Sequence, residues 1–465
     1  MIMLRIIWLQ FKHSWKAWFA ALFLFIVTGF LTGTCLNGIF TIADHFSHLS
    51  RMENPSDIFY YPMIFGVITL FIVSSGVIKL VINSMSKEYT LWTILGANPN
   101  QLAILIGGQL ALLGAIGAFI GFIFAVPFTV ALDTWVTNLT GFVHMPIIPL
   151  EFSIPACFWT VAFIFTISGM AGYLHSHKLF VNSQTDILNF KKRRSKFQSI
   201  THLLLILISA LGLIVSYGNS LIVTSQAQHY LALGNSHEAG KTYTQNLMII
   251  MLLSIILFAL VAQLILPKII KFWTQILPRQ TSATVNTAYW NTMFDKNYLS
   301  SLIAPLFGGS FLLTGVTYIT SGITNGGTNQ EATANSIASL VIYLGAPLLI
   351  ILANVLVITV IVSKQQRTNL NQLFLLGFTS TNAIVERIME AVIYAVTFFI
   401  CGVIGNLPLY LTVYRIEVIT HKPITVSWLS TMAWPAGLFG IILIFVAAVG
   451  GWHVLRFEKS AEKQM

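Results

Sequence analysis

The sequence predicts an all-α polytopic membrane protein. Hydrophobic residues make up 56% of the 465 positions, charged residues make up only 9%, and the apolar residues gather in long runs between short polar segments. The mean hydropathy of +0.80 agrees with these observations. A soluble domain with this composition would have too little polar surface to cover its core.

A helix that spans a bilayer needs roughly 20 mostly apolar residues, and about ten segments of this chain qualify. They cover 17–39, 63–83, 102–125, 154–174, 203–222, 247–266, 302–319, 337–362, 383–411 and 429–449. The amphipathic residues 1–16 are expected to form an uncleaved lead-in helix at the membrane surface.

The distribution of basic residues predicts the orientation in the membrane. The formal net charge is +10, but the basic residues lie between apolar runs and not in a folded polar domain, so nucleic acid is not expected as a partner. If the N-terminus is cytoplasmic, the outer loops carry only Arg51, Lys241, Arg415 and Lys422. The positive-inside rule therefore predicts that both termini are cytoplasmic.

A polar interruption at 86–101 predicts two helices that meet at a corner. The first helix should cover 87–96 and end at Gly96, which suits a left-handed closing residue. Asn98 is placed to cap the next helix, with Pro99 at its first position. The residues expected to form the surface of the short helix are Lys87, Glu88, Leu91, Trp92 and Leu95.

A second corner at 366–377 repeats this arrangement. When Leu95 and Gly96 are laid on Leu376 and Gly377, the order of lead-in, span, span, corner, span, span is the same in both halves. In this register Thr379 takes the cap position of Asn98. The second corner offers Arg367, Leu373, Leu376 and Gly377 as candidate contact residues.

This register predicts two four-helix repeats, at 1–190 and 280–465. Residues 191–279 join them and contribute an extra pair of spans. Each repeat has its own lead-in helix and its own short corner helix.

The string K-E-Y-T-L-W-T-I-L-G-A-N-P-N-Q resembles the FtsX/MacB-like permeases, the membrane subunits of type VII ABC systems. The matching residues are Glu88, Ile94, Leu95, Gly96, Ala97 and Gln101. In that family the short cytoplasmic helix is a coupling helix that docks on an ATPase. The resemblance implies that two ATPase copies, which carry ATP and Mg, dock at 87–96 and 366–377. It implies no catalytic residue and no bound cofactor or metal in this chain.

The layout is similar to that of the ten-span BceB-like permeases of bacitracin and lantibiotic resistance in the bacterial plasma membrane. Those proteins carry a large extracellular domain between the seventh and eighth spans, whereas the loop here is only about 320–336. The resemblance implies export of, or protection from, membrane-active peptides by mechanotransmission. Alternatives are handling of a lipid or lipoprotein, control of a cell-wall hydrolase, and an ion-coupled secondary transporter.

The chain contains no phosphate-binding loop of its own. The string from Gly234 to Lys241 and Thr242 places five residues between its glycines, where the phosphate loop has four, and it falls in a predicted outer loop. ATP is therefore expected to bind to a separate subunit.

Polar residues inside the spans are candidates for a conformational role, because burial in a membrane is costly. They are Lys79, Gln109, Glu386 and Glu390. The charged ones lie near the predicted cytoplasmic ends, where snorkelling to water is the alternative. Gly114, Gly117 and Gly121 form a stripe of small residues for tight helix packing, and Gly402 matches Gly121 in the second repeat.

Overall fold

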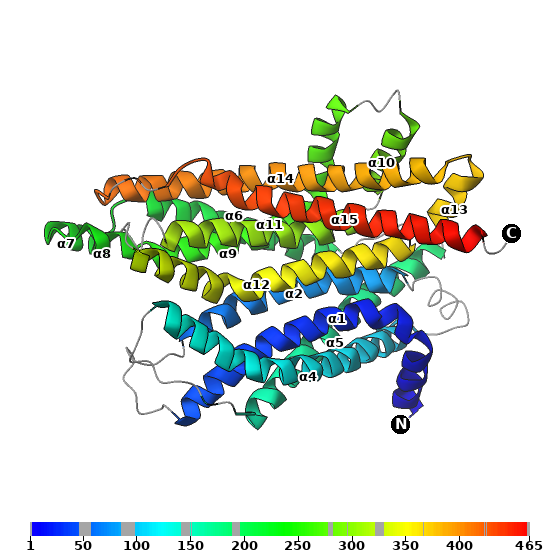
Figure 1. The fold of residues 1–465 in the computed structure, drawn as a ribbon, viewed down its shortest axis with the longest axis horizontal. Helices are drawn as coiled ribbons and strands as arrows, with labels where there is room; N and C mark the ends of the chain where they lie inside the picture. Colours follow the sequence, from blue (N-terminus) through cyan, green and yellow to red (C-terminus); the bar gives the residue numbers. More distant parts are fainter. Residues whose placement is uncertain are drawn as a thin grey trace. The chain divides into compact units, whose positions relative to one another are not determined.

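The computed structural model describes residues 2–45, 57–84, 98–140, 149, 151–187, 196–277, 282–294, 296–320, 330–365, 367–422, 424 and 426–462. Every regular element in these ranges is a helix (Figure 1). Nine helical segments among the residues searched are long and apolar enough to cross a membrane. A further helix of 28 residues, α2 (Asp57–Ser84), covers the predicted span at 63–83. The chain is therefore an all-α, multi-pass membrane protein.

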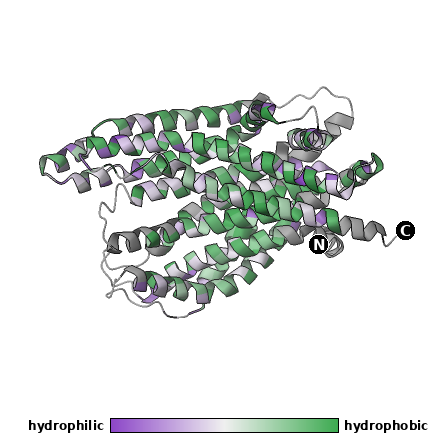
Figure 2. Cartoon of the chain, turned by 45° about the horizontal axis from the view of Figure 1, so that its top comes forward, coloured by the Kyte–Doolittle hydropathy of each residue, from purple (hydrophilic) through white to green (hydrophobic). Residues whose placement is uncertain are grey.

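The long helices are hydrophobic over most of their length, and hydrophilic residues gather toward the helix ends (Figure 2). The chain forms two compact units. The first consists of Met1–Lys196 with Val341–Ile361, and the second of Phe197–Leu340 with Val362–Met465. The two units differ in content from the predicted repeats, because 341–361 groups with the first unit. The repeats themselves stay a prediction.

The first unit is built around α4 (Pro99–Thr140), which packs along both α1 (Ile2–His45) and α5 (Ile154–Ile187). The middle of α12 (Gln330–Gln365) contributes Ile342 to a small core with Ile42, Phe59 and Val136. The interior is held mainly by apolar side chains of α1 and α4, such as Leu24, Phe25 and Phe122, which are almost fully buried.

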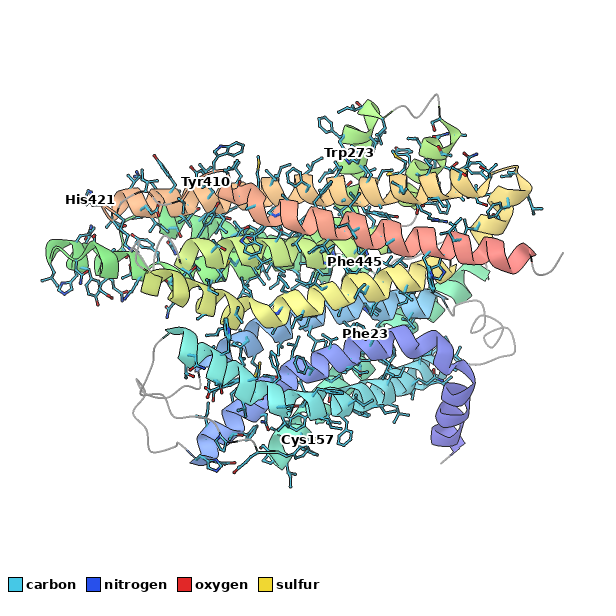
Figure 3. The ribbon with its side chains drawn as sticks, in the orientation of Figure 1. Phe23, Cys157, Trp273, Tyr410, His421 and Phe445 are labelled. Atoms are coloured by element: carbon cyan, nitrogen blue, oxygen red, sulfur yellow. The ribbon has the colours of Figure 1, made fainter. Side chains whose placement is uncertain are left out.

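The second unit is built around α14 (Ser380–Ile419), which packs against α15 (Ser430–Glu462), α11 (Lys296–Tyr318) and α10 (Ala283–Phe294). Two further long helices, α6 (Lys196–Leu221) and α9 (Thr244–Trp273), complete the unit with the short η1 (Thr274–Ile276). At the end of α9, Trp273 Nε1 donates a hydrogen bond of 3.1 Å to Thr397 Oγ1 of α14 (Figure 3).

Two short helices, α7 (Ser225–Ala232) and α8 (Ser236–Lys241), connect α6 to α9. The buried side chain of Tyr243 holds this connection, because its hydroxyl donates to Ile222 O at 2.9 Å and accepts from Thr224 N at 3.2 Å. Asn246 of α9 donates to Ser216 O and to Ser220 Oγ of α6 at 2.7 and 2.6 Å. Polar contacts therefore fix α6 to α9 where few apolar side chains pack.

Several helices are longer than their predicted spans. The prediction for α4 ended at 125, but the helix continues through Pro127 to Thr140. Similarly, α14 continues through Pro408 to Ile419. Hydropathy marks the apolar part of a helix and not its hydrogen-bonded length. Proline within a helix is also common in membrane proteins, so it does not mark a helix end there.

Candidate functional site

The first predicted corner lies outside the described residues, and with it Lys87, Glu88, Leu91, Trp92, Leu95 and Gly96. The structure does describe the start of the helix that follows this corner. Helix α4 begins at Pro99, and Asn98 Oδ1 accepts a hydrogen bond of 3.1 Å from Asn100 N. The predicted cap at Asn98 and the position of Pro99 are therefore confirmed.

The second corner contains the short helix α13 (Arg367–Leu375). It ends in a Schellman-type arrangement, because Phe378 N donates to Leu373 O and Gly377 N donates to Phe374 O, both at 3.0 Å. Gly377 has a φ of +89°, which favours glycine, so a side chain here would strain the turn. The predicted closure of the corner at Gly377 is confirmed.

Helix α14 begins immediately after this turn, capped by Thr379. Its Oγ1 accepts a hydrogen bond of 3.3 Å from Asn382 N, and its ψ of 162° is the extended conformation that a cap requires. The cap predicted at Thr379 is confirmed. The turn at Gly377 and this cap together fix the angle between α13 and α14.

One side of α13 is anchored and its end is exposed. Leu370 and Phe374 pack in a small apolar cluster with Ala383 of α14 and Val454 of α15. The two leucines that follow are exposed, Leu375 by 88% and Leu376 by 78%. Among the predicted contact residues, Leu376 and Gly377 are exposed, Leu373 is half-buried, and the side chain of Arg367 lies outside the described set.

The first turns of α14 carry three buried charged residues, Glu386, Arg387 and Glu390. Arg387 Nη1 donates to Glu390 Oε2 at 2.7 Å, and Arg387 Nε lies 3.4 Å from Glu386 Oε2. The side chains of the three residues are exposed by at most 4%. For Glu386 and Glu390, burial inside the protein excludes the alternative that they snorkel to water.

Neighbouring helices close this ionic cluster. Asn291 Nδ2 of α10 donates a hydrogen bond of 2.6 Å to Glu386 Oε1. The stem of Arg387 lies against Gly450 of α15, where an added Cβ would come within 3.2 Å of Arg387 Cβ. The cluster therefore joins α10, α14 and α15 a few turns beyond the exposed end of α13.

The other predicted polar residues belong to the first unit. Gln109 of α4 is fully buried. The side chain of Lys79 in α2 lies outside the described set, so its predicted role stays a prediction.

The glycine stripe on α4 faces two different helices. A Cβ at Gly117 or Gly121 would collide with α1 near Phe25, Ile26 and Phe30, so α1 and α4 lie very close together here. A Cβ at Gly114 would instead meet Ser168 of α5. Gly402 of α14 is less tightly enclosed, because its nearest neighbour is Pro435 of α15 at 3.2 Å.

Sequence reasoning missed some polar residues that the structure brings into the protein interior. Arg387 is not among the polar residues that the sequence singled out, although its i, i+3 spacing to Glu390 was a usable signal. Asn291 gave no local signal, because it lies far from Glu386 in the sequence. Asp133 of α4 and Glu417 of α14 are also fully buried.

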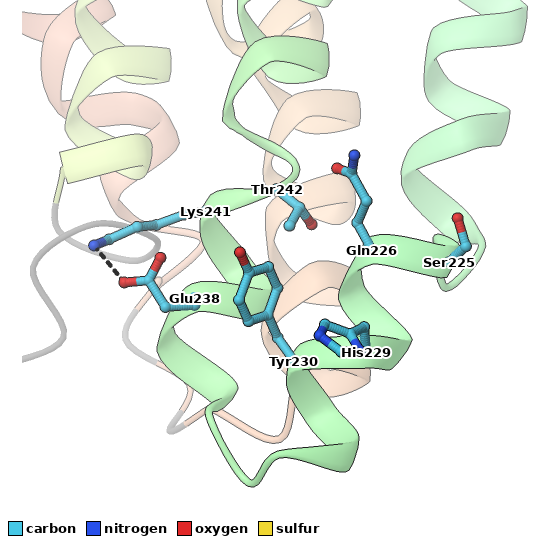
Figure 4. A pocket seen from close by; sticks show the side chains of 7 residues that line it. All are labelled: Ser225, Gln226, His229, Tyr230, Glu238, Lys241 and Thr242. Carbon is cyan, nitrogen blue, oxygen red and sulfur yellow. Dashed lines mark hydrogen bonds and ion pairs between the residues drawn. The ribbon is translucent and has the colours of Figure 1, made fainter.

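At the other end of α14 from α13, helices α7 and α8 form a polar hollow of about 540 Å³ (Figure 4). It is lined by Ser225, Gln226, His229, Tyr230, Glu238, Lys241 and Thr242. Lys241 Nζ pairs with Glu238 Oε1 at 2.8 Å, and Asn235 Oδ1 caps α8 by accepting from Glu238 N at 3.3 Å. The string that resembled a phosphate loop therefore forms a capped helical turn.

Lys422, which follows α14, lies against α8. A Cβ at Gly240 would be 3.0 Å from both Cε and Nζ of Lys422. Burial lowers the pKa of the Lys422 ammonium, and the nearby Glu417 carboxylate offsets part of this effect.

Comparison with known proteins adds no assignment to these observations. The chain matches no family model, and no curated protein is significantly similar to it. The fold defines the class of protein, an all-α multi-pass membrane protein, and the two ends of α14 define its candidate sites.

Proposed function

We propose that the chain is the permease subunit of an FtsX/MacB-like ABC transporter in a bacterial plasma membrane. In this proposal it works with a separate cytoplasmic ATPase, present in two copies, which binds ATP and Mg. The output is export of, or protection from, membrane-active peptides by mechanotransmission. The peptide substrate is proposed from the resemblance in span layout to resistance permeases.

The observation that carries this proposal is the corner formed by α13. A short helix is fixed on one side by Leu370 and Phe374 and presents Leu375 and Leu376 to its surroundings. Exposed apolar side chains on a rigid corner are typical of a protein docking surface. Because α13 is bound to the start of α14 and to the end of α15, a partner that moves α13 also moves both long helices.

The docking role can be tested by co-purification with the ATPase encoded beside this gene. We expect the double variant Leu375→Glu and Leu376→Glu to bind the ATPase at least about tenfold more weakly, because loss of two central apolar contacts exceeds about 1.4 kcal/mol. Both side chains are exposed, so the fold should tolerate the change.

Ile276→Glu is the matched control, because Ile276 is 87% exposed and lies in η1, which follows α9 on the predicted inner side. This variant should retain the ATPase. Equal binding by both variants would contradict docking at α13. If the wild-type chain retains no ATPase, the ABC proposal itself fails.

An ion-coupled secondary transporter is the second candidate, and the buried carboxylate pair of Glu386 and Glu390 favours it. Intramembrane acidic residues that face a protein interior commonly mark ion pathways. The test uses proteoliposomes that contain the chain without an ATPase. Uptake of a solute driven by a pH gradient would favour the secondary transporter. Transport that requires ATP and the partner would favour the first.

A further inference from the structure

The ionic cluster at the start of α14 does not balance its charges. Glu386 and Glu390 contribute two acidic groups, whereas Arg387 contributes one cation, and all three side chains are at least nine-tenths buried. If every group is ionised, the cluster carries one uncompensated negative charge. An unbalanced charge inside a protein at membrane depth is strongly unfavourable.

The contacts in the described part of the chain also leave some carboxyl oxygens of the cluster without a donor. Glu390 Oε2 accepts a hydrogen bond from Arg387 Nη1, and Glu386 Oε1 accepts one from Asn291 Nδ2. Glu386 Oε2 has only the 3.4 Å contact with Arg387 Nε. Glu390 Oε1 is buried and has no hydrogen-bond partner in the described part of the chain. Both carboxyl groups contact the same guanidinium, Glu386 through Arg387 Nε at 3.4 Å and Glu390 through Arg387 Nη1 at 2.7 Å. Two ionised carboxyl groups held beside one guanidinium repel each other, and one bound proton removes this repulsion.

We propose that Glu386 and Glu390 form a proton-binding site that holds one proton at neutral pH. The bound proton makes the cluster of two acids and one guanidinium electrically neutral. It also adds a hydrogen-bond donor to a cluster in which Glu390 Oε1 has no partner among the described residues. This is the arrangement by which two neighbouring acids avoid ionising together.

Among the side chains that the structure describes, few other groups face the cluster from the neighbouring helices. The polar group that faces the cluster from α10 is Asn291, and α15 contacts Arg387 through Gly450. On α14 itself Tyr394 lies one turn beyond Glu390, and its ring lies edge-on to Tyr298 of α11 at 5.0 Å. His453 lies one turn beyond Gly450 on α15 and is also titratable. A substitution of His453 is therefore needed to distinguish its protonation from that of the two acids.

The proton site is linked to helix movement through Asn291. The amide of Asn291 stabilises the ionised form of Glu386, because it donates to the carboxylate. If α10 moves away from α14, this donor is lost and the proton is held more tightly. The site therefore responds to the position of the lead-in helix.

Infrared difference spectroscopy of the purified full-length chain tests the proposal. The wild-type protein at neutral pH should show a deuterium-sensitive C=O band of a protonated carboxyl group. The contribution of the cluster to this band should disappear in Glu386→Gln and also in Glu390→Gln, because either change leaves one acid paired with Arg387. The buried acids Asp133 and Glu417 are the same in all these variants, so the comparison is with the wild-type spectrum. In Arg387→Met both acids need protons, so the band should be about twice as intense. In Asn291→Leu the band should persist to higher pH than in the wild type.

Glu238→Gln is the control, because Glu238 is a partly exposed acid already paired with Lys241. It should leave the band unchanged, and so should His453→Gln. Wild-type spectra in both glutamine variants would overturn the proposal, as would a band that is lost in His453→Gln. If a glutamine variant fails to fold, Glu390→Asp decides the question, because it should shift the band and an unchanged band would contradict the site.

The proton site does not depend on the proposed ABC function. The spectroscopic experiment requires neither an ATPase nor a substrate, and the co-purification experiment does not probe the cluster. Failure of one proposal therefore leaves the other standing.

Discussion

Gly121→Ala is expected to destabilise the protein strongly, because α1 and α4 touch at this position. The added methyl group would overlap the backbone of Ile26 and Phe30 in α1, and a backbone cannot move aside as a side-chain end can. Overpacking of this kind costs about 1–3 kcal/mol or more. Thermal unfolding of the detergent-solubilised protein should show a clearly lower midpoint.

Gly437→Ala in α15 is the matched control, because an added Cβ there meets nothing within 4 Å. The change should be neutral or should stabilise the protein by up to about 1 kcal/mol, since alanine favours a helix over glycine. If Gly121→Ala destabilises the protein and Gly437→Ala does not, the loss at Gly121 comes from tight packing and not from helix propensity. If Gly121→Ala unfolded like the wild type, α1 and α4 would not be held together by close backbone contact.

The long helices could be predicted because their hydrophobic runs reflect the membrane. Their ends could not be predicted as well, since α4 continues past Pro127, and hydropathy does not report backbone hydrogen bonds. The capping residues were more informative. Asn98, Thr379 and Gly377 each occupy the predicted position, because a cap depends on local chemistry that a few neighbouring residues define.

The candidate site could be predicted only in part. Glu386 and Glu390 stood out because acidic residues are rare in apolar runs. Asn291, the partner of Glu386, lies on α10 and contacts it only because of the tertiary fold. No spacing in the sequence indicates this contact. The same limit applies to the glycines, since the sequence shows a stripe on α4, whereas packing divides it between α1 and α5.

Arg387→Met is expected to be the other strongly destabilising substitution. It removes the cation from between two buried acids, and breaking a buried ion pair typically costs about 3–5 kcal/mol. The loss should increase as the pH is raised, because the folded variant must keep both carboxyl groups protonated whereas the unfolded chain need not. Chemical or thermal unfolding at several pH values measures both effects.

Lys241→Met provides a comparison at an ion pair that is much more exposed. The Lys241–Glu238 pair has a separation of 2.8 Å, close to the 2.7 Å of the Arg387–Glu390 pair, but its side chains are 41% and 39% exposed. Its removal should therefore cost less than about 1 kcal/mol. Combining Arg387→Met with Glu386→Gln and Glu390→Gln should recover most of the stability, because a neutral buried cluster has no charge to desolvate. If the triple variant were as unstable as Arg387→Met alone, the loss would come from the missing side-chain packing of Arg387 against Gly450 and not from the unpaired acids.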